Sequence, residues 1–476
     1  MNCRLTKTRA RDNSNIRKIL LALLFLLVGV CASAQALPAA PMPQTTPDHA
    51  PALSRLLARQ EPPAAQVNPA TPMTLSLKQA EALAVQNNPQ ISVARLTALA
   101  AEQVTREVRS NLWPTATANL TGVDSRENSR ITAGGLNNPI IYERAAAGVT
   151  VNQLVTDFGR TTNLTASANF AAKAESQNAI ATKEQILLAV DQSFYSALQA
   201  RAVLTVAQQT VSARQTLSAR VDALFKSKLR SQLDLSFANV NLAQAKLLLL
   251  DAQNNENAAR ASLSAVLGYP DLKAFQLIED TTAISAPPGN VDDLISQALV
   301  ERPEILALSF QYRANQKFQN AEHDLFFPTI EAIGVLGDTP VRNPVLSNWY
   351  GAVGVNVAIP LFNGFLYSAR SREANLKTQA AQGRLLDVRN RISRDVRTAW
   401  LASNAAYERL GVTQQLQDQA QLALDLAETR YNLGLSSIVE LSQAQLQQTQ
   451  AQIGNAQAGY DYRLALAVLR YQTIGI

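Results

Sequence analysis

Side chains that could carry catalysis are scarce in this chain of 476 residues, which has two cysteines and two histidines. The cysteines are Cys3 and Cys31, and the histidines, His49 and His323, lie far apart in the sequence. Both cysteines lie within the first 34 residues, so a zinc site, a cysteine nucleophile or a Ser-His-Asp triad in the rest of the chain would have to be built around one of the two histidines. The phosphate-cradling pattern GxxxxGK[ST] does not occur in the sequence. We therefore expect no catalytic, cofactor-binding or metal site, and we expect that the protein is not an enzyme.

The first 34 residues have the features of a secretory signal peptide. Six basic residues and one acidic residue precede an apolar run from Ile19 to Val30, and an Ala-Ser-Ala sequence ends at Ala34. The run is shorter than the roughly 20 residues of a membrane span. We predict cleavage after Ala34, with a mature chain that begins near Gln35; an uncleaved anchor or a lipid on Cys31 are the alternatives. Five of the six net positive charges lie in this leader, so we expect no nucleic-acid partner.

Residues 35–72 form a second segment with its own composition. They contain nine of the twenty prolines, and no hydrophobic period runs through them. We predict an extended, proline-rich linker here, with His49 as one of its solvated residues.

The remainder of the chain contains one series of signals twice. In each half a short amphipathic segment ends at a proline, and an aromatic–proline pair follows at the same distance. The two series are Asn88-Pro89 with Trp113-Pro114, and Arg302-Pro303 with Phe327-Pro328. Because proline ends a helix but fits the first turn of the next, we predict helices over 75–86 and 291–300, each followed by a second helix of about 22 residues. We divide this part into two structural repeats, residues 73–279 and 280–476.

Strand periodicity follows each aromatic–proline pair. Small, polar and aliphatic residues alternate over 115–122, 149–152 and 352–359, and the pattern over 329–336 is mixed. We predict two strands in each half, joined by loops near 127–141 and 337–347. Four strands cannot close a barrel, and in lipid an open sheet edge costs several kcal/mol for each unpaired backbone group. Strands in a membrane would therefore have to be combined from several chains, and three chains would supply twelve.

Long helices dominate the rest of each half. Neither glycine nor proline occurs from Arg160 to Leu267, and no proline occurs from Leu361 to the end of the chain. Apolar and small residues recur at heptad spacing in both stretches, which is typical of coiled-coil packing. One polar interruption divides each stretch, at residues 226–231 and 432–437. We predict two helical hairpins, each with a first helix of roughly 65 residues and about 100 Å.

At this point the sequence resembles the TolC-type outer-membrane efflux proteins, or outer membrane factors. The resemblance covers residues 73–476, and its most specific part is the stretch 431–444, with sequence YNLGLSSIVELSQA. It implies a mainly α-helical fold with a membrane β-barrel: three chains share twelve strands, four from each, and a long α-helical barrel of antiparallel coiled coils extends into the periplasm. It implies a homotrimer in outer-membrane lipid that acts as a passive exit duct of a tripartite efflux or type I secretion system. A periplasmic adaptor protein and an inner-membrane transporter would be its partners.

The resemblance also implies a gate at the tips of the helical hairpins. Tyr431 and Asp234 match positions that would hydrogen-bond across helices in the closed state, and Glu440 would form an acidic ring in the pore. Two positions differ from the best-known members, because Ser436 replaces a gate-latching arginine and Gln443 replaces a second acid. These differences imply a weaker latch and a single acidic ring. From the residues alone, Glu440 could instead be a solvated charge, Tyr431 a packed aromatic, and Asp234 a helix cap.

A different class of protein also fits part of the pattern. A periplasmic coiled-coil structural or adaptor protein without a membrane barrel would account for the signal peptide and the long helices. It would not require the duplicated strand pairs after the aromatic–proline signals. The exit duct is therefore the preferred hypothesis, and the sequence leaves the exported substrate and the class of pump open.

Overall fold

The computed structural model of this chain describes residues 73–124, 144–273, 275–279, 284–341 and 347–473. The predicted signal peptide with its cleavage point at Ala34, Cys31, and the proline-rich linker over 35–72 lie outside these residues. So does the whole of the loop expected at 127–141.

The described residues belong to two compact units. The strand unit contains Thr115–Asn152 and Ala332–Val355, and the helical unit contains Ala70–Pro114, Gln153–Glu331 and Asn356–Ile476. The elements come in the same order in the two halves of the chain: two short helices, two strands, and a pair of long helices.

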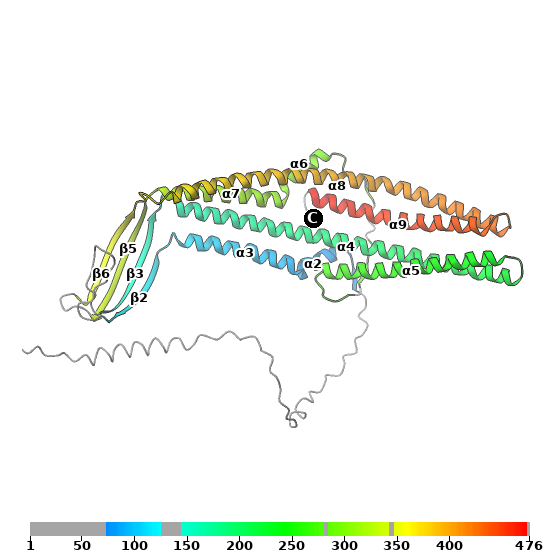
Figure 1. Cartoon of the computed structure of the whole chain (residues 1–476), viewed down its shortest axis with the longest axis horizontal. Coiled ribbons are helices and arrows are strands. Elements are labelled where there is room, and N and C mark those ends of the chain that lie inside the picture. Colours follow the sequence, from blue (N-terminus) through cyan, green and yellow to red (C-terminus); the bar gives the residue numbers. More distant parts are fainter. Residues whose placement is uncertain (1–72, 125–143, 274, 280–283, 342–346, 474–476) are drawn as a thin grey trace, which may run out of the picture. The chain divides into compact units, whose positions relative to one another are not determined.

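The strand unit is built around a four-stranded sheet with the order β2-β3-β5-β6 (Figure 1). Its strands are β2 (Thr115–Val123), β3 (Arg144–Thr156), β5 (Thr329–Val341) and β6 (Trp349–Ala358). β2 and β3 are antiparallel, with Thr115 opposite Asn152 and Val123 opposite Arg144. Two strands in each half confirm the prediction from the alternating pattern. In a single chain β2 and β6 are the edges of this sheet.

The second strand connection is shorter than expected. The loop predicted at 337–347 begins only after Val341, because β5 continues that far. The backbone N–H of Thr339 donates to the carbonyl of Asn348 over 2.6 Å, which carries the pairing past the expected end of the strand. Gly337 and Pro340 favoured a loop locally, and the backbone pairing outweighed that preference.

The helical unit contains two long helical hairpins (Figure 1). The first consists of α4 (Arg160–Lys226) and α5 (Gln232–Val266), and the second of α8 (Leu366–Asn432) and α9 (Ile438–Thr473). The first helix of each hairpin has 67 residues, which corresponds to about 100 Å at 1.5 Å per residue. Both hairpins turn at the predicted polar interruptions. No helix within the described ranges is long and apolar enough to cross a membrane.

Shorter helices pack beside the long ones. They are α2 (Leu77–Asn87), α3 (Pro89–Ser110), α6 (Val291–Glu301) and α7 (Pro303–His323). A proline stands at the start of α3 and of α7, as the sequence predicts. The residue before each proline contacts the end of the returning long helix of its own half. Asn88 donates to the carbonyl of Val266 over 2.9 Å, and Arg302 donates to the side chain of Gln472.

The first short helix begins two residues later than expected from the sequence. Leu75 belongs instead to a three-residue strand, β1 (Met73–Leu75), which pairs in parallel with β4 (Phe275–Leu277). Ser76 then caps α2 by a reciprocal capping box with Gln79. Strands of three residues have no measurable period, so the sequence pattern did not predict this pair. The pair packs on a core cluster that includes Phe194 of α4.

Both long hairpins begin at a left-handed backbone turn. Gly159 has φ +108°, and Phe158 before it has φ +54°. In the second half Gly364 has φ +62° and Phe365 after it has φ +67°. Positive φ values are unusual for a bulky residue, and the adjacent glycine accepts this conformation without steric cost. The chain therefore changes direction at the same point of both halves.

Candidate functional site

Both long helices end in the same hydrogen-bonded turn, which the sequence places next to the gate candidates. After α4, Leu229 N–H donates to the carbonyl of Leu224 over 2.9 Å, and after α8, Leu435 N–H donates to the carbonyl of Arg430 over 2.8 Å. This is the Schellman pattern, which needs a left-handed residue just beyond the helix. Lys228 takes that conformation with φ +60° and Gly434 with φ +77°. The two turns are thus fixed locally and place the first residues of α5 and α9.

Asp234 is hydrogen-bonded at the N-terminus of its own helix. It stands at the third position of α5, and its carboxylate accepts from the backbone N–H of Ser231 over 3.0 Å and from the Ser231 hydroxyl over 2.8 Å. The Ser231 hydroxyl in turn accepts from the Asp234 N–H over 3.1 Å. In this structure Asp234 therefore acts as a helix cap, which is the alternative role that the sequence allowed for it. The hydroxyl of Tyr431 has no hydrogen-bond partner among the described residues, so within one chain these two side chains are not bonded to each other.

Tyr431 is buried where the two hairpins meet. Its side chain is 2% exposed and packs in a cluster with Ile438 and Leu441 of the second hairpin. Leu217 of α4 and Phe237 of α5 pack against the same cluster from the first hairpin. Burial raises the pKa of the Tyr431 hydroxyl. The residue therefore joins the two hairpins through apolar contact just beside their turns.

Arg230 makes the polar contact between the two turns. Its guanidinium donates to the backbone carbonyl of Tyr431 over 2.6 Å, and its central carbon lies 4.1 Å from the centre of the Tyr431 ring. The contact thus combines a charge-assisted hydrogen bond with a cation–π interaction. Sequence reasoning missed this residue, because it looked for an arginine at the position of Ser436. The signal that could have found it is the arginine in the polar interruption of the other hairpin.

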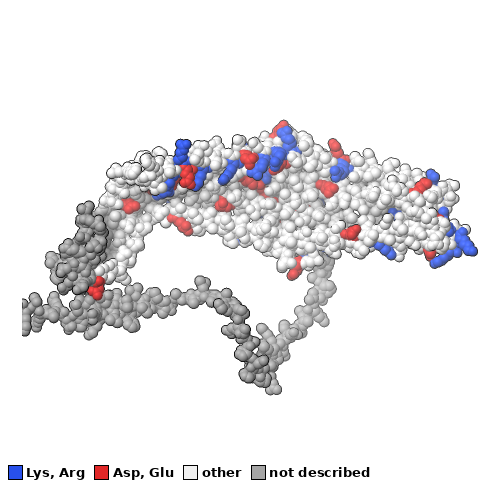
Figure 2. All heavy atoms as spheres, viewed as in Figure 1, with Lys and Arg blue, Asp and Glu red and all other residues white. Residues whose placement is uncertain are grey.

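The remaining gate candidates lie around the start of α9. Glu440 is exposed, and one of its carboxylate oxygens lies 3.5 Å from Nε of Arg430. Gln443 is also exposed, whereas the Ser436 hydroxyl is buried and has no hydrogen-bond partner in the described part of the chain. Figure 2 shows basic side chains at the turn end of the helical unit. The α4–α5 turn contributes Lys226, Lys228 and Arg230 to this end.

The site offers packing and charge rather than catalytic chemistry. Within the described ranges, no group of three or more His, Cys, Asp or Glu side chains could hold a metal ion. The structure brings Tyr431 and Arg230 into contact and places Glu440 on the first turn of α9. Such an arrangement can hold two helical hairpins together and can present charge at their turns.

The sequence matches the profile of a family described as outer membrane efflux protein, over residues 82–269 and 294–473. The outer membrane protein TolC of Vibrio cholerae is 26% identical over 416 residues, which are 82% of this chain and 89% of that protein. A crystal structure of a membrane protein from Pseudomonas aeruginosa has a TM-score of 0.75 at 23% identity and covers 84% of this chain and 93% of its own. The outer-membrane channel OprN has a TM-score of 0.74 at 19% identity, with 84% and 90% covered. These comparisons agree on the family and on a channel fold.

Proposed function

The chain belongs to the outer membrane efflux protein family, and from this premise we propose that it is the exit duct of a tripartite efflux or type I secretion system. It is an outer-membrane efflux channel that conducts its substrates passively. Relatives along most of its length are named as outer membrane efflux proteins and channels, and this match is the observation that carries the function. A periplasmic adaptor and an inner-membrane transporter complete the system, since the sequence has no phosphate-cradling motif with which to drive transport itself.

The open sheet supports an assembly of several chains. β2 and β6 are edges in a single chain, and every residue of β6 is exposed. An unpaired edge is not tolerated in lipid, so each β6 pairs with β2 of a neighbouring chain. Three chains then close a twelve-stranded barrel in outer-membrane lipid. The two repeats of each chain, residues 73–279 and 280–476, supply two strands each.

The outer face of the first hairpin supports the same assembly. α5 has a stripe of exposed apolar side chains at heptad spacing, formed by Leu233, Val240, Leu247 and Leu250. Such a stripe is the seam of a coiled coil without its partner helix. In a homotrimer these side chains pack against the second hairpin of the next chain, and the long helices close into a periplasmic tunnel.

We place the periplasmic gate of this tunnel at the hairpin turns. Tyr431 and Asp234 remain the proposed contact across helices, and Glu440 forms the acidic ring. Arg230 supplies the cationic link that Ser436 lacks, since its guanidinium already holds the backbone of Tyr431. Gln443 is neutral, so a single acidic ring faces the pore.

The assembly is tested by the native mass of the detergent-solubilised protein together with its location and conductance. We expect a trimer that partitions with outer membranes and forms channels in planar bilayers. Leu247→Gln, on the exposed stripe, should lower the yield of trimer, while Lys246→Gln at the preceding position should leave it unchanged. A stable monomer that reconstitutes into membranes, or a protein recovered only from the soluble periplasm, would overturn the proposed duct.

A further inference from the structure

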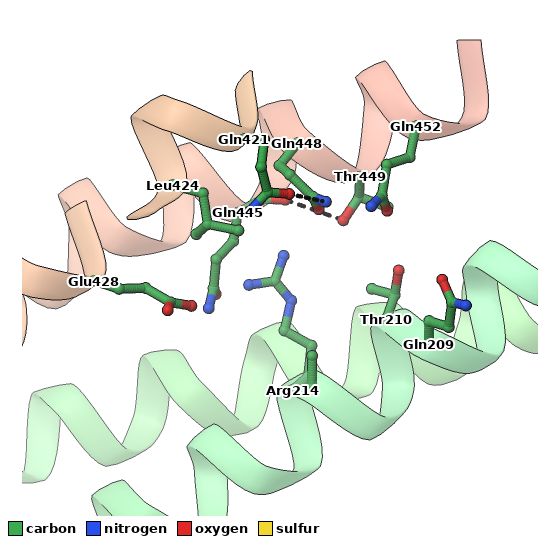
Figure 3. A pocket seen from close by; sticks show the side chains of 11 residues that line it. Gln209, Thr210, Arg214, Gln421, Leu424, Glu428, Gln445, Gln448, Thr449 and Gln452 are labelled. Atoms are coloured by element: carbon green, nitrogen blue, oxygen red, sulfur yellow. Dashed lines mark hydrogen bonds between the residues drawn. The ribbon is translucent and has the colours of Figure 1, made fainter. Parts of the chain in front are cut away.

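A polar crevice separates the first hairpin from the second near their turns (Figure 3). α4 forms one wall, and α8 and α9 form the other. The crevice has two adjoining compartments of about 200 Å³ and about 420 Å³, which share Gln209, Glu428 and Gln445 among their lining residues. Most of the side chains that line the smaller compartment are glutamines and threonines. The surface between the hairpins is thus polar at this point, in contrast to the apolar cluster around Tyr431.

Arg214 is the charged side chain at the centre of this crevice. It is 7% exposed and extends from α4 toward α8 and α9 (Figure 3). Its guanidinium makes no hydrogen bond to the other side chains drawn in Figure 3. Burial lowers the pKa of Arg214 to about 10, and the more distant Glu428 opposes this effect. A buried cation without a bonded partner is costly, and a guanidinium presents donors in a planar fork.

A second polar group in the crevice also lacks a partner. The amide oxygen of Gln445 on α9 is buried and makes no hydrogen bond in the described part of the chain. Gln445 lies across from Arg214 (Figure 3). Arg214 thus presents hydrogen-bond donors to the space between the walls, whereas the free oxygen of Gln445 is an acceptor, and only the amide N–H groups of this side chain could donate to an anion.

The charges that line the crevice decide which ligand fits. Arg214 and Arg220 of α4 are cationic, and Glu428 of α8 is the acid among the lining residues. The net charge of these three lining residues is positive, and the buried one among them is the arginine Arg214. We propose that this crevice is a binding site for a small oxyanion, of the carboxylate or phosphate class, with the Arg214 guanidinium as its anchor.

The guanidinium fork matches two oxygens of such an anion, and charge-assisted bonds of this kind are the strong ones. Thr210 and the glutamine amides around it can donate to the remaining oxygens. Glu428 repels the anion and weakens its binding. A bound anion would tie α4 to α8 and α9, since it bonds to both walls of the crevice.

The test uses the full detergent-solubilised protein, with inorganic phosphate as the probe and sodium chloride at equal ionic strength as the reference. We expect a saturable rise of the thermal unfolding midpoint with phosphate, and a matching heat of binding by calorimetry. Arg214→Gln should weaken phosphate binding by roughly tenfold or more, since a charged hydrogen-bonding partner is lost. Glu428→Gln should strengthen it, because the repulsion is removed. Arg409→Gln, an exposed arginine of α8 outside the crevice, is the matched control and should bind as the parent does.

Three results would overturn the site. The parent could respond to phosphate no more than to chloride at equal ionic strength. Arg214→Gln could retain the saturable response. Glu428→Gln could bind phosphate with the affinity of the parent, an outcome that remains decisive if Arg214→Gln fails to fold. Competition by acetate against phosphate would show that carboxylates share the site, and an absence of competition would restrict it to phosphate.

Discussion

Asp191 provides the sharpest test of the energetics of this fold. It lies on α4 with a side chain that is 2% exposed, and one of its carboxylate oxygens has no hydrogen-bond partner in the described part of the chain. Burial is the main reason that its pKa rises from 3.8 to about 7. Glu81 of α2 adds to the rise by charge and by a hydrogen bond between the two side chains, whereas Arg470 of α9 favours the ionised form.

The size and sign of the effect follow from the linkage between protonation and folding. The rise of the Asp191 pKa from 3.8 to about 7 corresponds to a change of at most roughly 4 kcal/mol in the free energy of unfolding. Because the folded protein holds this proton more tightly than the unfolded chain, the contribution is fully present below pH 4. It is lost as the pH rises to about 7. Asp191→Asn removes the ionisation of this side chain.

The assay is the thermal unfolding midpoint of the detergent-solubilised protein between pH 5 and pH 8. The parent should lose stability over this range, and Asp191→Asn should lose less. The variant should therefore be the more stable of the two at pH 8. Asp251→Asn, on the exposed face of α5, is the matched control and should follow the parent. The reasoning is refuted if the parent is equally stable at pH 5 and pH 8, or if Asp191→Asn has the same slope as the parent.

Three further predictions concern the hairpin turns. Arg230→Gln removes the charge that holds the Tyr431 carbonyl, so the fraction of time that the channel spends open in planar bilayers should increase; an unchanged open fraction would exclude Arg230 from the latch. Ser231→Ala removes the capping box of α5 and should lower the free energy of unfolding by about 1 kcal/mol, as measured by denaturant midpoint; no loss would mean that the cap is replaced by water. Glu440→Gln should lower cation selectivity and abolish block by trivalent ions in single-channel recordings, and parental selectivity would show that the acid does not face the pore.

The sequence by itself determined the plan of the helices and strands. The absence of glycine and proline after Arg160 and the absence of proline after Leu361, together with heptad spacing, predicted both 67-residue helices to within a few residues. The polar interruptions marked both hairpin turns, and the prolines marked the starts of α3 and α7. These features depend on residues within one or two helical turns of each other, so short segments of the sequence are enough to predict them. The resemblance to a known family followed from the same windows.

Tertiary structure alone decided which side chains meet. The strand pair β1–β4 joins residues about 200 positions apart, and neither strand has a period of its own. Arg230 contacts Tyr431 across the same kind of separation, while Asp234 stays on its own helix start. The burial of Asp191 and of Arg214 depends on which helices cover one face of α4, and a charged residue on a helix has the same local pattern whether it is covered or solvated. Spacing along the chain reports periodicity, whereas contacts between hairpins depend on where distant segments come to lie.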